Sequence, residues 1–233
     1  MISEKLIELT KRGFTQMTYL SKFFATVALT ALIAIPMTSS ANEQVKITKE
    51  MSSYEFTWQG EKHVIARNQD TEATITPIFA KTSRPCPWFC IQPATLAPGV
   101  DTIAELEVIN YIKRMVEGEN ILVVDSRTPD WVARGTIATA KNIPWTKLYP
   151  SKSNPETISS IMQKEFGAKL SDGLWDFSEA KTLVMFCNGM WCAQSPNNIK
   201  ALLTYGYPAQ KIKWYRGGMQ NWEILGLSTV KSK

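Results

Sequence analysis

The feature that most constrains this chain is a short apolar run that ends at a cysteine and is followed by a loop and a helical segment. Thr182–Phe186 is apolar and β-rich, which is typical of a strand buried on both faces of a parallel sheet. Cys187 follows directly, at the carboxyl edge of the predicted sheet, where open α/β folds bind their ligands. The sequence therefore predicts a thiol held at a strand-loop-helix turn.

The loop and the start of the helix are expected to favour the thiolate form of Cys187. Ser195 is a good N-cap residue and Pro196 a good first helical residue. Unpaired backbone N–H groups and the positive end of the helix dipole favour a negative charge beside them, so we expect the pKa of Cys187 to be lowered. The residues of the active-site loop would be Asn188, Gly189, Met190, Trp191, Cys192, Ala193, Gln194 and Ser195.

Residues 1–41 have the pattern of a secretory signal. Lys22 precedes an apolar run over residues 23–37, and small residues follow it. The run is short for a membrane span, so we expect signal peptidase to cleave after Ala41. The mature protein would then be exported, in the periplasm, with no membrane attachment. We also expect Met17 to be the true start. An uncleaved signal anchor is the alternative.

Composition excludes several classes of function. At 233 residues and 44% hydrophobic content, the chain can form one large or two small packed domains. Its net charge of +5 is spread out, without the basic blocks typical of nucleic-acid binding, so we expect no nucleic-acid partner. His63 is the single histidine and lies outside any motif, which disfavours a Ser-His-Asp or Cys-His hydrolase. We expect no metal and no cofactor.

The four cysteines form two close pairs, Cys86 with Cys90 and Cys187 with Cys192. In an oxidising compartment an even number of cysteines is first interpreted as disulfides. Loops this short, however, would gain little stability from closure. The pairs therefore favour chemical or redox sites, with Cys86 and Cys90 as a possible redox pair. Two structural disulfides and a four-thiolate zinc site are the alternatives, although the spacing is looser than in the usual zinc knuckle.

Residues 42–100 are predicted to form a β-rich segment and a Cys/Pro-rich linker. Alternation over residues 53–67, with a turn at Gln59-Gly60, predicts a β-hairpin, and another strand is expected over residues 73–79. Residues 83–93 hold three prolines and two cysteines, which favours a stiff extended loop. This segment either covers the site of the following domain or is a disulfide-pinned linker.

Residues 101–233 alternate between strand and helix patterns, which predicts a parallel sheet. The expected elements are a helix over 102–117, a strand over 121–124 ending at Asp125, a strand edge at Ile143-Pro144, a helix over 156–166, a loop over 171–177, a strand over 212–215 and a final short helix after Gly217-Gly218.

Three motifs of this domain resemble those of the rhodanese-like sulfurtransferases. Leu122–Arg127 and Gly135–Pro144 together resemble the family's first signature, with Thr136 and Thr139 at the family's histidine and glycine. The strand-ending Cys187 is similar to the family's active-site cysteine. Arg216–Trp222 resembles the closing Gly-Gly-x-x-x-Trp signature, and the resemblance spans residues 101–229.

The resemblance implies an α/β fold in which a central parallel sheet is flanked by helices, here after a small β-rich segment. It also implies a sulfurtransferase in which Cys187 takes sulfane sulfur as a persulfide, from thiosulfate or a persulfide donor, and passes it to a thiol or cyanide acceptor. A protein thiol is a possible partner. Asp125 and Arg127 would form a structural pair behind the loop, whereas Arg216 would face an anionic donor or lie on the surface.

The loop departs from the family pattern. Seven residues separate Cys187 from Ser195, more than is common in the family, and none is charged, whereas many thiosulfate-using relatives carry a cation there. A phosphatase of related fold would need an arginine at the loop end, and this chain has none there. Cys192 could attack a Cys187 persulfide to release sulfide and close a disulfide, or could protect Cys187 from irreversible oxidation.

The alternatives to a sulfurtransferase are a thiol-disulfide oxidoreductase or redox sensor and a binding module without catalytic activity. A periplasmic thiol-disulfide oxidoreductase or redox sensor would use Cys187/Cys192 and Cys86/Cys90 as exchanging pairs, but the chain lacks a Cys-x-x-Cys motif. A catalytically silent binding module is disfavoured by the cysteine itself.

We expect the mature protein, purified from cells that express the full chain, to begin at Asn42 on N-terminal sequencing, because small residues precede that position as signal peptidase requires. A mature protein that still begins at or before Met17 would support the signal anchor instead.

Overall fold

The computed structural model describes residues 43–231. The chain divides into two units, residues 1–41 and residues 42–233. The expected signal, its cleavage site and Met17 therefore lie outside the described residues.

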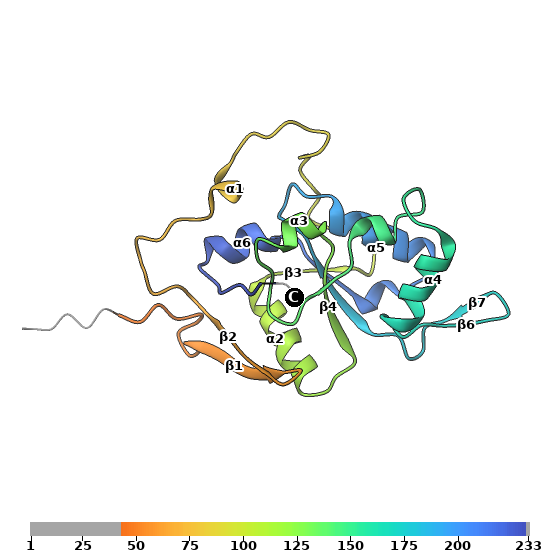
Figure 1. The fold of residues 1–233 in the computed structure, drawn as a ribbon, viewed down its shortest axis with the longest axis horizontal. Coiled ribbons are helices and arrows are strands. Elements are labelled where there is room, and N and C mark those ends of the chain that lie inside the picture. Colours follow the sequence, from red (N-terminus) through yellow and green to blue (C-terminus); the bar gives the residue numbers. More distant parts are fainter. Residues whose placement is uncertain (1–42, 232–233) are drawn as a thin grey trace, which may run out of the picture. The chain divides into compact units, whose positions relative to one another are not determined.

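A parallel sheet of five strands forms the centre of the described unit (Figure 1). Across the sheet the strands lie in the order β3 (Asp101–Ile103), β9 (Ile212–Tyr215), β8 (Thr182–Phe186), β4 (Ile121–Asp125) and β5 (Lys141–Asn142). Every neighbouring pair is parallel. Phe186 is in register with Asp125 on one side and Tyr215 on the other, so these strands end together. The predicted α/β fold with a central parallel sheet is confirmed.

Helices cover both faces of this sheet. Along β8, Val184 and Phe186 join one apolar cluster, whereas Leu183 and Met185 join the other. The first cluster includes side chains from α2 (Glu105–Val116) and α6 (Gly218–Ile224), and the second from α4 (Pro155–Lys164) and α5 (Gln194–Thr204). Burial on both faces explains why the strand sequence is uniformly apolar rather than alternating.

The remaining helical elements are short. They are α1 (Pro77–Ala80), α3 (Pro129–Val132) and the 3-10 turns η1 (Trp145–Lys147) and η2 (Ala209–Lys211). Proline opens both α1 and α3, where its missing N–H costs nothing. None of the helices in residues 43–231 has the length and apolar character needed to cross a membrane.

Three sequence predictions are corrected by the structure. No strand forms over residues 73–79, because Pro77, which cannot donate to a ladder, starts α1 instead. The helix expected from residue 102 begins at Glu105, because Asp101–Ile103 pairs with β9. Most of the loop expected over 171–177 is instead part of a hairpin, in which β6 (Lys169–Ser171) pairs with β7 (Leu174–Asp176) and only residues 172 and 173 form the turn. Its Asp172-Gly173 pair, with φ of 51° and 78°, is a hairpin-turn signal that the sequence reading overlooked.

The N-terminal β-rich segment contains the predicted hairpin, formed by β1 (Ser53–Trp58) and β2 (Glu61–Ala66). Phe56 and Ile65 bury their side chains in the first cluster. After the hairpin, the Asn68 amide donates to the Gly226 carbonyl at 2.7 Å. The hairpin is therefore joined to the end of the α/β domain, and the domain boundary expected at residue 100 stays a prediction.

Candidate functional site

The loop after β8 starts at the carboxyl edge of the sheet. Cys187 follows the central strand, and its side chain is only 2% exposed. Beside it, the Ser126 amide donates to the Phe186 carbonyl at 3.0 Å, which continues the pairing of β4 with β8 up to the cysteine. The position predicted for Cys187 thus matches the observed fold.

The start of α6 holds the first residues of the loop through two backbone hydrogen bonds. The Met219 and Gln220 amides donate to the carbonyls of Cys187 and Asn188 at 3.0 and 2.9 Å. Gly218, with φ of 55°, leaves no room for a side chain: a Cβ atom there would lie 2.4 Å from the Cys187 carbonyl oxygen. The second glycine of the Gly217-Gly218 motif is therefore required by close contact between α6 and the cysteine loop.

A chain of hydrogen bonds ends on the Cys187 sulfur. The Trp214 Nε1–H group donates to Ser195 Oγ at 3.1 Å, and Ser195 Oγ donates to Cys187 Sγ at 3.1 Å. All three side chains are buried. Because the indole can only donate, it fixes the serine hydroxyl so that its proton points to the sulfur.

This arrangement corrects the predicted role of Ser195. Helix α5 begins at Gln194, and its N-cap is Ala193, which makes no side-chain cap. Ser195 lies within the first turn and uses its hydroxyl on the thiol rather than on the helix backbone. Short-range sequence signals cannot separate these roles, because a capping serine and a thiol-binding serine occupy almost the same place in the chain.

The thiols of Cys187 and Cys192 are shifted in opposite directions. Burial raises the pKa of Cys187, but hydrogen bonds from the Cys192 thiol, from the Ser195 hydroxyl and amide, and from the Gly189 amide outweigh burial and lower that pKa to about 7. Burial raises the pKa of Cys192 well above its ordinary value, and the neighbouring Cys187 sulfur raises it further. The pair therefore holds its first negative charge on Cys187.

Asp125 and Arg127 form a buried ion pair at the end of β4. Arg127 Nη2 lies 2.6 Å from Asp125 Oδ2, and both side chains are 1% exposed. The Thr136 hydroxyl donates to the same carboxylate at 2.7 Å, and the Gly135 carbonyl accepts from Arg127. This saturated pair matches the expected structural role, and removing one partner would cost about 3–5 kcal/mol.

Arg216 does not face the cysteine loop. Its guanidinium donates to the carbonyls of Gln92 and Pro93 at 2.7 and 2.9 Å. These bonds fasten the Cys/Pro-rich segment to the end of β9, and the role of Arg216 toward an anionic donor stays a prediction.

The Cys/Pro-rich segment, residues 83–93, lies against the cysteine loop. The Gln92 amide donates to the Met190 carbonyl at 2.8 Å, and the rings of Phe89 and Trp191 lie 5.2 Å apart. Within it, Cys86 and Cys90 form a disulfide, whereas Cys187 and Cys192 are free thiols. The segment therefore both covers the site and carries its own disulfide, so the two interpretations left open by the sequence hold together.

A pocket of about 330 Å³ adjoins the loop where this segment meets it. Five of its eleven lining residues are aromatic, and Cys192 lines it whereas Cys187 does not. The aromatic residues of the wall are Trp88, Phe89, Trp131, Trp145 and Trp191. We call this space the aromatic pocket.

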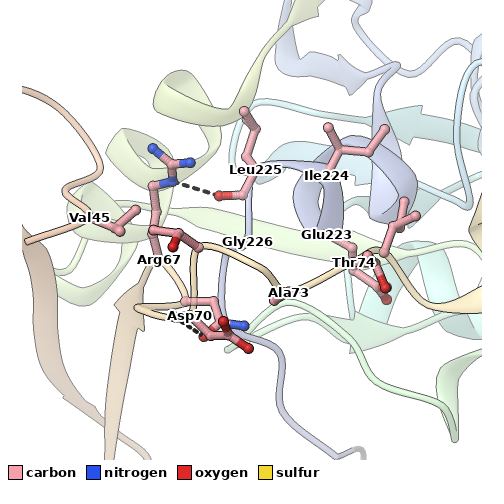
Figure 2. Close-up of a pocket in the computed structure, with 12 residues that line it drawn as sticks. Val45, Arg67, Asp70, Ala73, Thr74, Glu223, Ile224, Leu225 and Gly226 are labelled. Carbon is pink, nitrogen blue, oxygen red and sulfur yellow. Dashed lines mark hydrogen bonds between the residues drawn. The ribbon is translucent and has the colours of Figure 1, made fainter. Parts of the chain in front are cut away.

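Another pocket, of about 560 Å³, lies between the segment after β2 and the end of α6 (Figure 2). Arg67 borders it and donates from Nε to the Leu225 carbonyl at 2.7 Å. No residue of the cysteine loop lines it, so it is separate from the thiol site. Among residues 43–231, no group of three or more His, Cys, Asp or Glu side chains is placed to hold a metal ion.

The decisive comparison is with protein-family models. The model of the rhodanese-like domain matches residues 108–225. The chain belongs to the rhodanese-like domain family. No curated protein matches the sequence.

Parts of this chain are similar to solved structures. A protein from Bacillus halodurans is 21% identical over 53% of this chain and 71% of its own, with a TM-score of 0.37. The human single-domain sulfurtransferase is 20% identical over 53% of this chain and 96% of its own, with a TM-score of 0.36. The thiosulfate sulfurtransferase of Pseudomonas aeruginosa is 15% identical over 57% of this chain and 21% of its own, with a TM-score of 0.38.

The sequence reading missed several residues that shape this rhodanese-like site. The sequence predicts Trp214 only as part of a strand and Gln220 only as part of the closing motif, with no contact to the cysteine loop. Gln220 accepts from Trp191 Nε1 at 2.8 Å and donates to the Phe79 carbonyl at 2.7 Å, so it joins the loop to α1. Only the three-dimensional fold brings these positions together, since each lies at least 19 residues from its partner.

Replacement of Gly218 by alanine is expected to destabilise the protein by about 3 kcal/mol, because the new methyl group meets the Cys187 carbonyl and the residue keeps a left-handed φ. Gly60→Ala is the matched control: it has φ of 81° but open space around its Cβ, and should cost only about 1 kcal/mol. Urea unfolding measures both. Equal losses would show that the close contact with the loop is unimportant.

The Ser195→Ala variant is expected to raise the pKa of Cys187, because it loses a donor to the thiolate. In the wild type the thiolate forms as pH rises through about 7 and is lost below it. The half-maximal pH for alkylation of Cys187, followed by mass spectrometry of the modified peptide, should move upward in the variant.

Ser159→Ala removes a half-buried hydroxyl on α4, which accepts from Gln163 and does not contact the cysteine loop, and should leave this profile unchanged. An unshifted profile in Ser195→Ala would exclude the serine as a donor to the sulfur.

Proposed function

We propose that this protein is a sulfurtransferase that carries sulfane sulfur as a persulfide on Cys187. Membership of the rhodanese-like family supports a sulfurtransferase-type function. The observation that carries the proposal is the buried Cys187 thiol at the end of the central strand, whose pKa is lowered to about 7 by several converging donors. A thiolate is the nucleophile in sulfur exchange.

The proposed reaction has two steps. The Cys187 thiolate attacks the outer sulfur of thiosulfate or of a persulfide. A new S–S bond forms while the donor's own S–S bond breaks, so sulfite or a thiolate leaves. An acceptor thiolate or cyanide then attacks the outer sulfur on Cys187 and takes it as a persulfide or thiocyanate, and the Cys187 thiolate is restored. The sulfur keeps its oxidation level throughout, so no cofactor is needed.

The surrounding donors fit both steps. The persulfide carries its negative charge on the outer sulfur, and the amides of Gly189 and Ser195 together with the Ser195 hydroxyl can stabilise either that charge or the returning thiolate. The donors are already held in place by Trp214 and by α6. Little reorganisation is therefore required when charge moves along the S–S bond.

A thiol-disulfide oxidoreductase is the second candidate. Its specific support is the closeness of the two cysteines, since a disulfide needs neighbouring sulfurs: the Cys187 thiol donates to the Cys192 carbonyl at 3.3 Å, and each thiol shifts the pKa of the other. An external disulfide would have to supply the oxidation. In this reading Cys86 and Cys90, already bonded to each other, would be the second exchanging pair.

We also propose that the protein is exported to the periplasm and acts there on small sulfur compounds or on a protein thiol. The signal-like residues 1–41 support export. The Cys86–Cys90 disulfide is consistent with it, since such bonds persist in oxidising compartments.

Intact-mass measurement after addition of a persulfide donor should show a gain of one sulfur atom in the wild type and in Cys192→Ser, but not in Cys187→Ser, because the lower pKa makes Cys187 the nucleophile. Loss of two hydrogens in the wild type, together with no sulfur gain in Cys192→Ser, would favour the oxidoreductase, because in that variant Cys192 cannot remove the sulfur from a Cys187 persulfide. Sulfur gain in Cys187→Ser and none in Cys192→Ser would reassign the nucleophile to Cys192.

A further inference from the structure

The aromatic pocket carries no ionised group on its wall. Of the described residues that line it, five are aromatic and none is Asp, Glu, Lys or Arg. The polar groups are the neutral amides of Asn188, Gln194 and Asn197 and the thiol of Cys192, whose raised pKa keeps it protonated. A doubly charged anion would lose its hydration in such a pocket without gaining an opposite charge.

Three arginines near this region bind other groups, and a fourth, Arg134, lies with its guanidinium 5.5 Å from the ring centroid of Trp131. Arg127 is paired with Asp125 and buried, and Arg216 donates to the carbonyls of residues 92 and 93. The Arg84 guanidinium lies 4.9 and 4.8 Å from the ring centroids of Phe89 and Trp191, and it also donates to the Ile78 carbonyl. The guanidiniums of Arg84 and Arg134 thus lie against rings of the wall, and Arg84 Nε has no hydrogen-bond partner, but neither arginine lines the pocket itself.

The pocket leads to the thiol pair from the Cys192 side. Cys192 lines the pocket, and its carbonyl accepts a hydrogen bond from the Cys187 thiol at 3.3 Å, whereas Cys187 itself is absent from the lining. A molecule bound among the tryptophans would therefore lie next to Cys192, which directly contacts Cys187. The volume of about 330 Å³ is at the lower end of the roughly 300–1,000 Å³ that small organic ligands occupy.

We propose that the aromatic pocket binds the organic group of the sulfur donor, so that the preferred donor is a ring-bearing organic sulfane-sulfur compound rather than thiosulfate. This inference rests on the proposed sulfurtransferase function. The ring would pack against the tryptophan faces, which favour stacked or edge-to-face contacts. For an organic persulfide, the Cys187 thiolate attacks the outer sulfur, the donor's S–S bond breaks, and the organic thiolate leaves with the electron pair.

Three donors that differ only in the group beside the sulfane sulfur provide the test: thiosulfate, methanethiosulfonate and benzenethiosulfonate. Each transfers its outer sulfur to a thiolate and releases sulfite or the corresponding sulfinate. The measured quantity is kcat/KM with cyanide as acceptor, divided by the rate constant of the same donor with free glutathione, which removes differences in leaving group. We expect benzenethiosulfonate to exceed methanethiosulfonate by about tenfold and thiosulfate to be the poorest.

Two variants locate the preference in the pocket. Trp145→Ala removes one wall ring and should abolish the advantage of the benzene donor over methanethiosulfonate. Trp88→Arg places a cation at a position that is 80% exposed, so it should fold normally, raise the rate with thiosulfate and lower the benzene preference. Trp175→Ala, on β7 outside the pocket, is the matched control and should retain the wild-type order.

The outcomes separate this inference from the proposed function. Equal normalised rates for all three donors, or a preference unchanged in both pocket variants, would overturn the organic-donor proposal while leaving a sulfurtransferase in place. If no donor adds sulfur to Cys187 in the wild type, the sulfurtransferase itself is refuted.

Discussion

The contact between Gly218 and the Cys187 peptide is the constraint on which the rest of the site depends. The start of α6 can approach the loop only because residue 218 lacks a side chain, and the approach lets two α6 amides bind loop carbonyls. These bonds turn the carbonyls of residues 187 and 188 toward α6, which fixes the course of the loop just after the sheet. A loop held in this way can present its amides to a sulfur without being ordered afresh at each turnover.

The same constraint explains how a longer loop keeps an ordered thiol. Extra loop residues would ordinarily add conformational freedom. Here the start, the middle and the end of the loop are each held by hydrogen bonds to a different part of the chain. The start is bound to α6, Met190 is bound by Gln92, and the indole of Trp191 is held by Gln220. Ser195, at the far end, is oriented by Trp214. Cys192 thus reaches the neighbourhood of Cys187 on a rigid support.

Sequence reasoning predicted those parts of the fold whose signals are local. The uniformly apolar strand Thr182–Phe186, the alternating hairpin around Gln59-Gly60 and the position of Cys187 all depend on neighbouring residues, and the structure has them. The strand Asp101–Ile103 was assigned to a helix because its partner, β9, lies about a hundred residues away. The role of Ser195 depended on an indole from β9, and the aromatic pocket on rings from four separate stretches of chain. No spacing rule could bring these together.

Because residues 83–93 cover the loop, the hydrogen-bond donors around the Cys187 sulfur and one wall of the aromatic pocket come from different stretches of the chain. The sulfur and its donors belong to residues 187–218, inside the stretch shared with the rhodanese-like family. Trp88 and Phe89, which form one wall of the aromatic pocket, come from before that stretch. Mutation of this preceding segment can reshape the wall while every hydrogen bond to Cys187 stays in place. Changes in one stretch can therefore alter the shape of the pocket beside Cys192 without changing any residue of the reactive centre, which is encoded in another.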